Sequence, residues 1–243
     1  MTARDGYART LLALPEEEWE PYLAAHSGLP GPRGNLELLA AVGDLASADD
    51  LRRWATSADE YLAACGTAGL GRLLVEGDDV EPLLRTLAAD ARWRVREAVA
   101  MALQRLGDAD LDRLLRLTEA WADRGPLVQR AAVAGLCEPR LLRTDTGSRA
   151  ALRLVDRVTA ALAAVPSARR RDDEVRTLRK ALGYCWSVAV AAAPATGFPL
   201  LAGWASSDDA DVRWVVRQNT TKARLVRADA EWAGRIRDLV TPG

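Results

Sequence analysis

Residues 91–107, ARWRVREAVAMALQRLG, predict an amphipathic helix, and the interpretation of the whole chain starts from this stretch. Apolar residues recur in it at three- and four-residue spacing, the pattern of a helix with one buried face; they are Val95, Ala98, Val99, Ala102, Leu103 and Leu106. A second stripe, on another face, contains Trp93, Glu97, Ala100 and Gln104. A large aromatic residue beside a carboxylate, away from the buried stripe, is a candidate functional pair.

The same pattern returns 33 residues later and again near the C-terminus. VREAVAMAL (95–103) aligns with VQRAAVAGL (128–136), and WRVREA (93–98) is echoed by WVVRQN (214–219). Ala, Leu, Arg and Glu dominate these segments, and all four favour helix. Helices are therefore expected in pairs, at 80–90 with 93–106, 111–122 with 126–137, 148–165 with 172–193, and 197–206 with 209–227.

Two-helix units of about 30 to 50 residues cannot bury their apolar faces alone and therefore stack. The sequence predicts an all-α fold: a curved α-solenoid whose second helices line a concave inner face. We expect a single repeat domain over residues 1–243. Within it, 1–34 form an N-terminal helical cap and loop, 35–227 the repeats, and 228–243 a C-terminal capping helix.

Helix starts and close contacts are also visible upstream of the repeats. Asn35 and Ser47 are predicted N-caps, since their side chains can accept hydrogen bonds from the first turn. The predicted helix 59–76 carries small residues, among them Gly66 and Gly69, on part of its surface. Small residues allow a neighbouring helix to approach closely, which outweighs their lower helix propensity.

Composition excludes several classes of function. No apolar run approaches the roughly 20 residues that cross a bilayer, and no signal peptide is recognisable, so a cytoplasmic protein is expected. Cys65, Cys137 and Cys185 form no CxxC pair and are expected to be buried, reduced thiols. His26 is the only histidine, which argues against Ser-His-Asp catalysis and zinc sites. No metal or cofactor is expected.

The net charge of −1 conceals an asymmetry. Residues 1–120 contain 13 Arg and Lys against 21 Asp and Glu, whereas residues 121–243 contain 20 against 13. Two interpretations remain open at this point. The basic half binds a polyanion, or solvated helix faces simply differ in charge.

Alignment of the second helices places Glu97 with Arg130, Lys180 and Gln218, and Trp93 with Arg176 and Trp214. Tyr184 follows Lys180 by one turn, and two arginines flank Trp214. Cationic residues contact phosphates, and aromatic residues pack on sugars or bases. The candidate nucleic-acid-binding residues are Trp93, Arg130, Arg176, Lys180, Tyr184, Arg213, Trp214 and Arg217.

Each of these residues also has a structural interpretation. An exposed arginine is usually only solvated, and Glu97 can be a surface partner of Arg94 or Arg130. Trp93 and Trp214 can pack between repeats, because tryptophan is commonly mostly buried. The run Arg169–Arg171 is either a backbone-contacting loop or a solvated linker, and the two aspartates that follow it reduce its charge.

At these residues the chain resembles the HEAT-repeat proteins, and within them the HEAT-like DNA alkylation repair group, the alkylpurine DNA glycosylases. The segments that carry the resemblance are WRVREAVAMAL (93–103), LVQRAAVAGL (127–136), LRKALGYCW (178–186) and DVRWVVRQNTTKARL (211–225). The similarity covers about residues 30–227. It implies HEAT-like repeats and a DNA-backbone contact at Arg130, and it places Tyr184 where the family has tryptophan.

The family also has a tryptophan and an aspartate one turn apart beside the lesion. Trp93 and Glu97 have that spacing, with glutamate in place of aspartate. The resemblance implies that Glu97 is the catalytic carboxylate, stabilising positive charge as the glycosidic bond breaks, without flipping the base into a pocket. The longer side chain leaves two alternatives: a glycosylase, or a relative that only binds DNA.

Two functions follow as hypotheses. The first is a monomeric protein of DNA alkylation repair that binds double-stranded DNA and releases N3- or N7-alkylated purines. The second is a non-catalytic HEAT-repeat scaffold that binds a protein partner, which the near-zero net charge and the acidic N-terminal half support. Fold alone does not decide between them.

Overall fold

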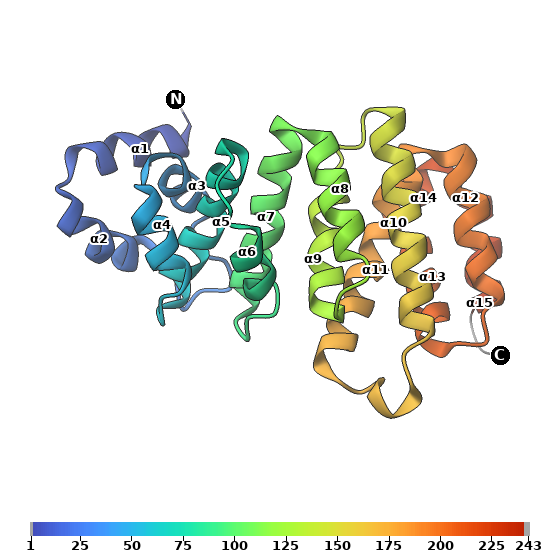
Figure 1. Cartoon of the computed structure of the whole chain (residues 1–243). Helices are drawn as coiled ribbons and strands as arrows, with labels where there is room; N and C mark the ends of the chain where they lie inside the picture. Colours follow the sequence, from blue (N-terminus) through green and yellow to red (C-terminus); the bar gives the residue numbers. More distant parts are fainter. Residues whose placement is uncertain (1, 241–243) are drawn as a thin grey trace. The chain divides into compact units, whose positions relative to one another are not determined.

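The computed structural model describes residues 2–240, and these are all-α (Figure 1). They form fifteen α-helices and three short 3-10 helices, and no strand occurs among them. The predicted fold class is confirmed at this level. Within the described part of the chain, no helix has both the length and the apolar character needed to cross a membrane.

The helices group into two compact units, residues 1–110 (unit 1) and 111–243 (unit 2). The single domain expected from the sequence stays a prediction, because a repeat array can also group in this way. Unit 1 contains α1 (Ala3–Ala13), η1 (Glu16–Glu18), α2 (Trp19–His26), α3 (Leu36–Leu45), α4 (Ala48–Ala55), α5 (Glu60–Glu76), α6 (Glu81–Leu87) and α7 (Trp93–Ala109).

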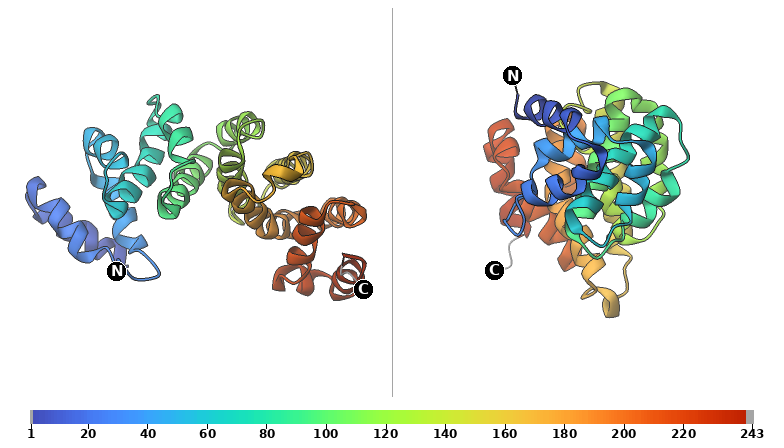
Figure 2. Two further views of the ribbon diagram at one scale, coloured as in Figure 1. Left: turned by 90° about the horizontal axis from the view of Figure 1, so that it is seen from below. Right: turned by 90° about the vertical axis from the view of Figure 1, so that its left-hand side faces the viewer.

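Unit 2 begins with the pair α8 and α9 and ends at α15. Its elements are α8 (Leu111–Trp121), α9 (Pro126–Leu136), α10 (Asp145–Ala163), η2 (Ser167–Arg169), α11 (Asp173–Ala192), α12 (Pro194–Gly203), η3 (Trp204–Ser206), α13 (Ala210–Thr220), α14 (Ala223–Ala228) and α15 (Ala230–Val240). The predicted capping helix at 228–243 corresponds to α15, and its last three residues lie outside the described part of the chain. Within the unit, α11 packs against α9, α10 and α13 (Figures 1 and 2).

The centre of unit 1 is α5, which packs against α3, α4 and α7. Its glycines permit this, as the sequence predicts. A Cβ atom on Gly66 would lie 2.2 Å from the backbone nitrogen of Ala55 in α4, and one on Gly71 would lie 2.7 Å from the Cα of Ala102 in α7. Two helices therefore approach α5 at backbone distance, which no larger residue allows.

The predicted buried stripe of α7 is confirmed at all six positions (Val95, Ala98, Val99, Ala102, Leu103 and Leu106). Ala100, expected on the second stripe, is buried as well at 3% exposure. The caps Asn35 and Ser47 are also confirmed, accepting hydrogen bonds from the backbone N–H groups of Leu38 and Asp50, both at 3.1 Å.

The single helix expected over residues 209–227 is wrong, because α13 ends at Thr220 and α14 begins at Ala223. Side-chain hydroxyls compete for the carbonyls of the last turn. The Thr220 hydroxyl donates to the Arg217 carbonyl and the Thr221 hydroxyl to the Gln218 carbonyl, both at 2.8 Å. Such local hydrogen bonds offer the backbone an alternative to continued helix.

Candidate nucleic-acid interface

Trp93 and Glu97 of unit 1 line one pocket of about 520 Å³. Trp93 is the first residue of α7 and is 48% exposed, and Glu97 is exposed one turn later. α3 contributes Leu36 and Leu39 to the pocket, and α5 contributes Tyr61. The predicted aromatic–carboxylate pair therefore shares one site.

Arg94 ties this pocket to its surroundings. Its guanidinium carbon lies 4.6 Å from the centroid of the Trp93 ring, a cation–π contact. Its Nη1 donates to a Glu60 carboxylate oxygen at 3.0 Å, and its Nη2 donates to the Gly31 carbonyl at 3.0 Å. One cation thus joins the start of α7 to α5 and to the loop before α3, and it steadies the indole.

Tyr184 of unit 2 is the centre of a second cluster. Its side chain is 47% exposed on α11. Arg224 Nη2 donates to its hydroxyl at 2.7 Å, and the Arg224 guanidinium carbon lies 4.8 Å from the ring centroid. Lys222 Nζ lies 6.0 Å from the same centroid. Two cations therefore stand over one exposed aromatic ring.

The sequence alone did not single out Lys222 and Arg224. Lys222 lies between α13 and α14 and Arg224 is the second residue of α14, where one continuous helix was expected. Arg176 and Lys180 precede Tyr184 on α11 at four-residue spacing, and both are exposed, so the three share one helix face. We call Arg176, Lys180, Tyr184, Lys222 and Arg224 the unit-2 cationic surface.

Trp214 and Arg213 have structural roles. Trp214 is the fifth residue of α13, whereas Trp93 is the first of α7, so the sequence alignment of the two is offset by one turn relative to the helix starts. Trp214 packs against Gly183, and the Arg179 guanidinium carbon lies 4.6 Å from its ring centroid. These contacts place Trp214 between α11 and α13.

Arg213 corresponds in position to Arg96, since each is the fourth residue of its helix. Arg213 Nη1 donates to the Ser207 carbonyl at 2.8 Å, and Arg96 Nη1 donates to the Asp90 carbonyl at 2.6 Å, six residues back in both cases. This repeated contact fastens the turn before each helix. It gives Arg213 a partner within its own unit.

The remaining candidates differ in exposure. Arg130, expected to contact the DNA backbone, is only 8% exposed in α9, which leaves little of it open to a ligand. Arg217 is half-buried on α13. In the basic run, Arg169 pairs with Asp172 at 3.1 Å, and Arg170 pairs with the Asp209 carboxylate. These two arginines therefore fasten the linker.

The charge asymmetry follows the unit boundary. Unit 1 carries 11 Arg and Lys against 19 Asp and Glu, and unit 2 carries 22 against 15. Among the described residues, no group of three or more His, Cys, Asp or Glu side chains is placed to hold a metal. The three cysteines are free and buried, as predicted, and burial raises the pKa of the Cys65 thiol.

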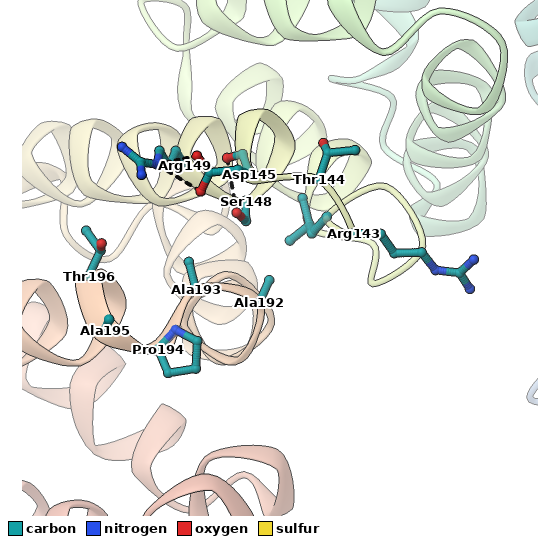
Figure 3. A pocket seen from close by; sticks show the side chains of 11 residues that line it. Arg143, Thr144, Asp145, Ser148, Arg149, Ala192, Ala193, Pro194, Ala195 and Thr196 are labelled. Carbon is teal, nitrogen blue, oxygen red and sulfur yellow. Dashed lines mark hydrogen bonds and ion pairs between the residues drawn. The ribbon is translucent and has the colours of Figure 1, made fainter.

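Unit 2 contains a further cavity, of about 350 Å³, where the start of α10 meets the junction of α11 and α12 (Figure 3). Two of its polar side chains, Arg149 and Ser148, are engaged with Asp145. Arg149 Nε donates to the Asp145 carboxylate at 2.9 Å, and the Ser148 hydroxyl donates to the Asp145 carbonyl at 3.2 Å. The Arg143 side chain extends away from this pair (Figure 3). We assign no ligand to this cavity.

No family model matches the chain, and no curated protein matches it. Two crystal structures of engineered proteins from the Northeast Structural Genomics Consortium do. One is 19% identical, covering 90% of this chain and 95% of its own, with a TM-score of 0.40. The other is 12% identical, covering 82% and 100%, with a TM-score of 0.34. We draw nothing about function from either.

Proposed function

We propose that this protein binds double-stranded DNA through the unit-2 cationic surface. The observation that carries the proposal is Tyr184, an exposed ring with Lys222 and Arg224 over it. Lysine and arginine neutralise phosphates, and an aromatic side chain packs against sugars or bases. The excess of basic residues in unit 2 favours the approach of a polyanion to this unit.

We also propose that the helices form a curved α-solenoid of HEAT-like repeats with a concave face. Two observations support it. Consecutive helices pack in pairs within each unit, such as α8 with α9 and α10 with α11. The Arg96 and Arg213 contacts repeat the same fastening at the start of two second helices.

DNA binding is tested by the double variant Lys180→Ala, Arg224→Ala. We expect affinity for a short duplex to fall about tenfold or more. The slope of log affinity against log salt should become shallower by about 2, since two phosphate contacts are lost. Fluorescence anisotropy at several salt concentrations measures both quantities.

The matched control is Arg149→Ala, Arg235→Ala, which removes the same charge from unit 2. Both arginines are exposed and pair with a carboxylate one turn away on their own helix. This variant should keep the wild-type salt slope. If both double variants lost the same affinity for the duplex, the loss would come from net charge alone. That result would contradict binding at the proposed surface.

We further propose that the protein acts in DNA alkylation repair, with Glu97 stabilising the sugar cation as an alkylated purine departs. The support is that Trp93 and Glu97 line one site, together with the family resemblance. Removing one preorganised charge-stabilising group from an active site typically costs about 100-fold or more in rate. Glu97→Gln should therefore slow release of N7-methylguanine from a methylated duplex by about that factor.

Chromatography of the released base gives the rate, and Glu37→Gln is the control because Glu37 is also an exposed carboxylate of unit 1. If the wild-type protein bound the duplex but released no base, only the proposed repair activity would be contradicted. The DNA-binding proposal would stand in that case, since it rests on unit 2.

The protein-binding alternative is favoured by unit 1. Its 19 acidic residues against 11 basic ones favour the approach of basic partners. Absence of duplex binding at low salt would leave this alternative as the function.

A further inference from the structure

Both lysines of the chain lie on the unit-2 cationic surface. The sequence contains 33 basic residues, and all except Lys180 and Lys222 are arginines. Lys180 is exposed on α11, one turn before Tyr184. Lys222 lies between α13 and α14, and its Nζ is 6.0 Å from the centroid of the Tyr184 ring. Folding therefore brings both amines of the lysine side chains to one exposed ring, although they are 42 positions apart in the sequence.

The protein uses arginine and lysine differently. Arginines form ion pairs that join separate helices, such as Arg94 with Glu60 at 3.0 Å and Arg105 with Asp44 at 3.0 Å. Among residues 2–240, by contrast, neither lysine is paired with a carboxylate. The two amines therefore contribute charge to the surface without fastening one element of the fold to another.

Lysine also differs from arginine in that acylation can remove its charge. The neutral form of the amine is a nucleophile, whereas the guanidinium group of arginine is not deprotonated in proteins. Acetylation of a lysine gives an amide that carries no charge and can no longer pair with an anion. An acyl donor would thus remove charge at this surface and leave the 31 arginines of the chain charged.

The charge of the unit-2 cationic surface indicates which donor it attracts. Arg176 and Arg224 belong to the same surface as the two lysines. Guanidinium groups bind phosphate oxygens, and an acyl phosphate carries a phosphate group joined directly to its reactive acyl carbon. Cations that hold this phosphate keep the donor near the lysine amines, and such proximity accelerates the transfer.

We propose that Lys180 and Lys222 are acylation sites at which a small acyl phosphate weakens DNA binding. The neutral amine attacks the acyl carbon, so that a C–N bond forms and the C–O bond to phosphate breaks. Phosphate leaves with the electron pair of that bond and takes up the proton that the amine loses. Each modified lysine loses one positive charge. This inference rests on the proposed function, because it concerns regulation of the same surface.

The modification itself is tested by treating the full chain with acetyl phosphate and locating the acetyl groups by peptide mass spectrometry. We expect both lysines to be acetylated, Lys180 faster than Lys222, because the first is exposed and the second is half-buried. Saturating duplex DNA should slow both reactions about tenfold by covering the amines. A short synthetic peptide with one lysine serves as the reference in the same mixture, and DNA should not protect it.

The effect on DNA binding is measured by fluorescence anisotropy at several salt concentrations. Acetylation of both lysines should lower the affinity for a short duplex about tenfold. The slope of log affinity against log salt should become shallower by about 2, since two phosphate contacts are lost. The control is Lys180→Arg, Lys222→Arg, which keeps both charges but contains no lysine. Treatment with acetyl phosphate should leave the affinity of this variant where it was before treatment.

Three results would overturn the inference. One is that both lysines stay unmodified while the reference peptide is acetylated. Another is that protein acetylated at both lysines binds the duplex with the affinity and salt slope of untreated protein. The third is that treatment weakens the arginine variant as much as the wild type, which would assign the effect to another group.

Failure of the proposed function would be recognised separately. In that case untreated wild-type protein would bind no duplex even at low salt, which would contradict both DNA binding and its regulation. If untreated protein bound the duplex and acetylation at both lysines left the affinity unchanged, only the regulatory inference would be contradicted.

Discussion

Replacing Asn219 by alanine is expected to lower the free energy of unfolding of unit 2 by about 3 kcal/mol. Asn219 is fully buried in α13, and its amide is inserted into the backbone hydrogen bonding of α11. Its Oδ1 accepts from the Ser187 N–H at 2.8 Å, and its Nδ2 donates to the carbonyls of Leu182 at 2.9 Å and Val215 at 2.8 Å.

The size of this effect follows from what alanine leaves behind. A buried donor at Ser187 and a buried acceptor at Leu182 lose their partner, and each unsatisfied group costs about 1 to 3 kcal/mol. Urea denaturation followed by circular dichroism measures the loss. Gln218→Ala is the control, since the adjacent residue is only half-buried. A change below about 1 kcal/mol for Asn219→Ala would show that α11 closes its own ladder without the amide.

The Asn219 amide also holds the part of α11 that carries Tyr184. Tyr184 lies between Leu182 and Ser187, the two α11 residues that Asn219 joins, and the Ser187 hydroxyl donates to the Tyr184 carbonyl at 2.7 Å. The α11 backbone that presents the exposed ring is therefore held by a side chain of α13.

Gly66→Ala is expected to destabilise unit 1 by about 3 kcal/mol or more, at the upper end of overpacking effects. The added Cβ would lie 2.2 Å from the Ala55 nitrogen, 2.6 Å from the Leu51 carbonyl oxygen and 2.7 Å from the Trp54 carbonyl carbon. All three atoms are backbone of α4, so no side-chain rotation relieves the clash. The helices themselves must separate.

Thermal denaturation checks this prediction, with Gly6→Ala as the matched control. Gly6 lies within α1, and a Cβ there would meet nothing within 4 Å. Alanine has the higher helix propensity, so the control should gain up to about 1 kcal/mol. Unchanged stability of Gly66→Ala would mean that α4 and α5 do not depend on their close approach.

Local sequence patterns were sufficient to predict most of the helices of this protein. The spacing of apolar residues in 93–106 placed the helix and its buried stripe, and Asn35 and Ser47 marked helix starts, because side-chain periodicity and capping act within a few residues. The sequence also predicted that the glycines of α5 allow close contact with a neighbouring helix. Ala100, on the second stripe, is buried as well, because a helix packed on more than one side buries more than one stripe.

The candidate site was predictable only in part. Trp93 with Glu97, and Lys180 with Tyr184, are one turn apart, so helical geometry alone put each pair on one face. Lys222 and Arg224 were missed, since their place over Tyr184 depends on the break after Thr220. The burial of Arg130 and the packing of Trp214 against Gly183 depend on neighbouring helices, which no single-helix pattern contains.

The order of the amino acids was enough to predict the all-α class, most of the helix boundaries, the close-packing face of α5 and the acidic and basic halves. These properties follow from interactions between residues a few positions apart, or from composition. Only the tertiary structure shows that Asn219 bonds to the α11 backbone, that Arg224 reaches Tyr184 and that Leu36, Tyr61 and Trp93 share one pocket. The residues in each of these groups lie 25 or more positions apart along the chain, so only folding brings them together.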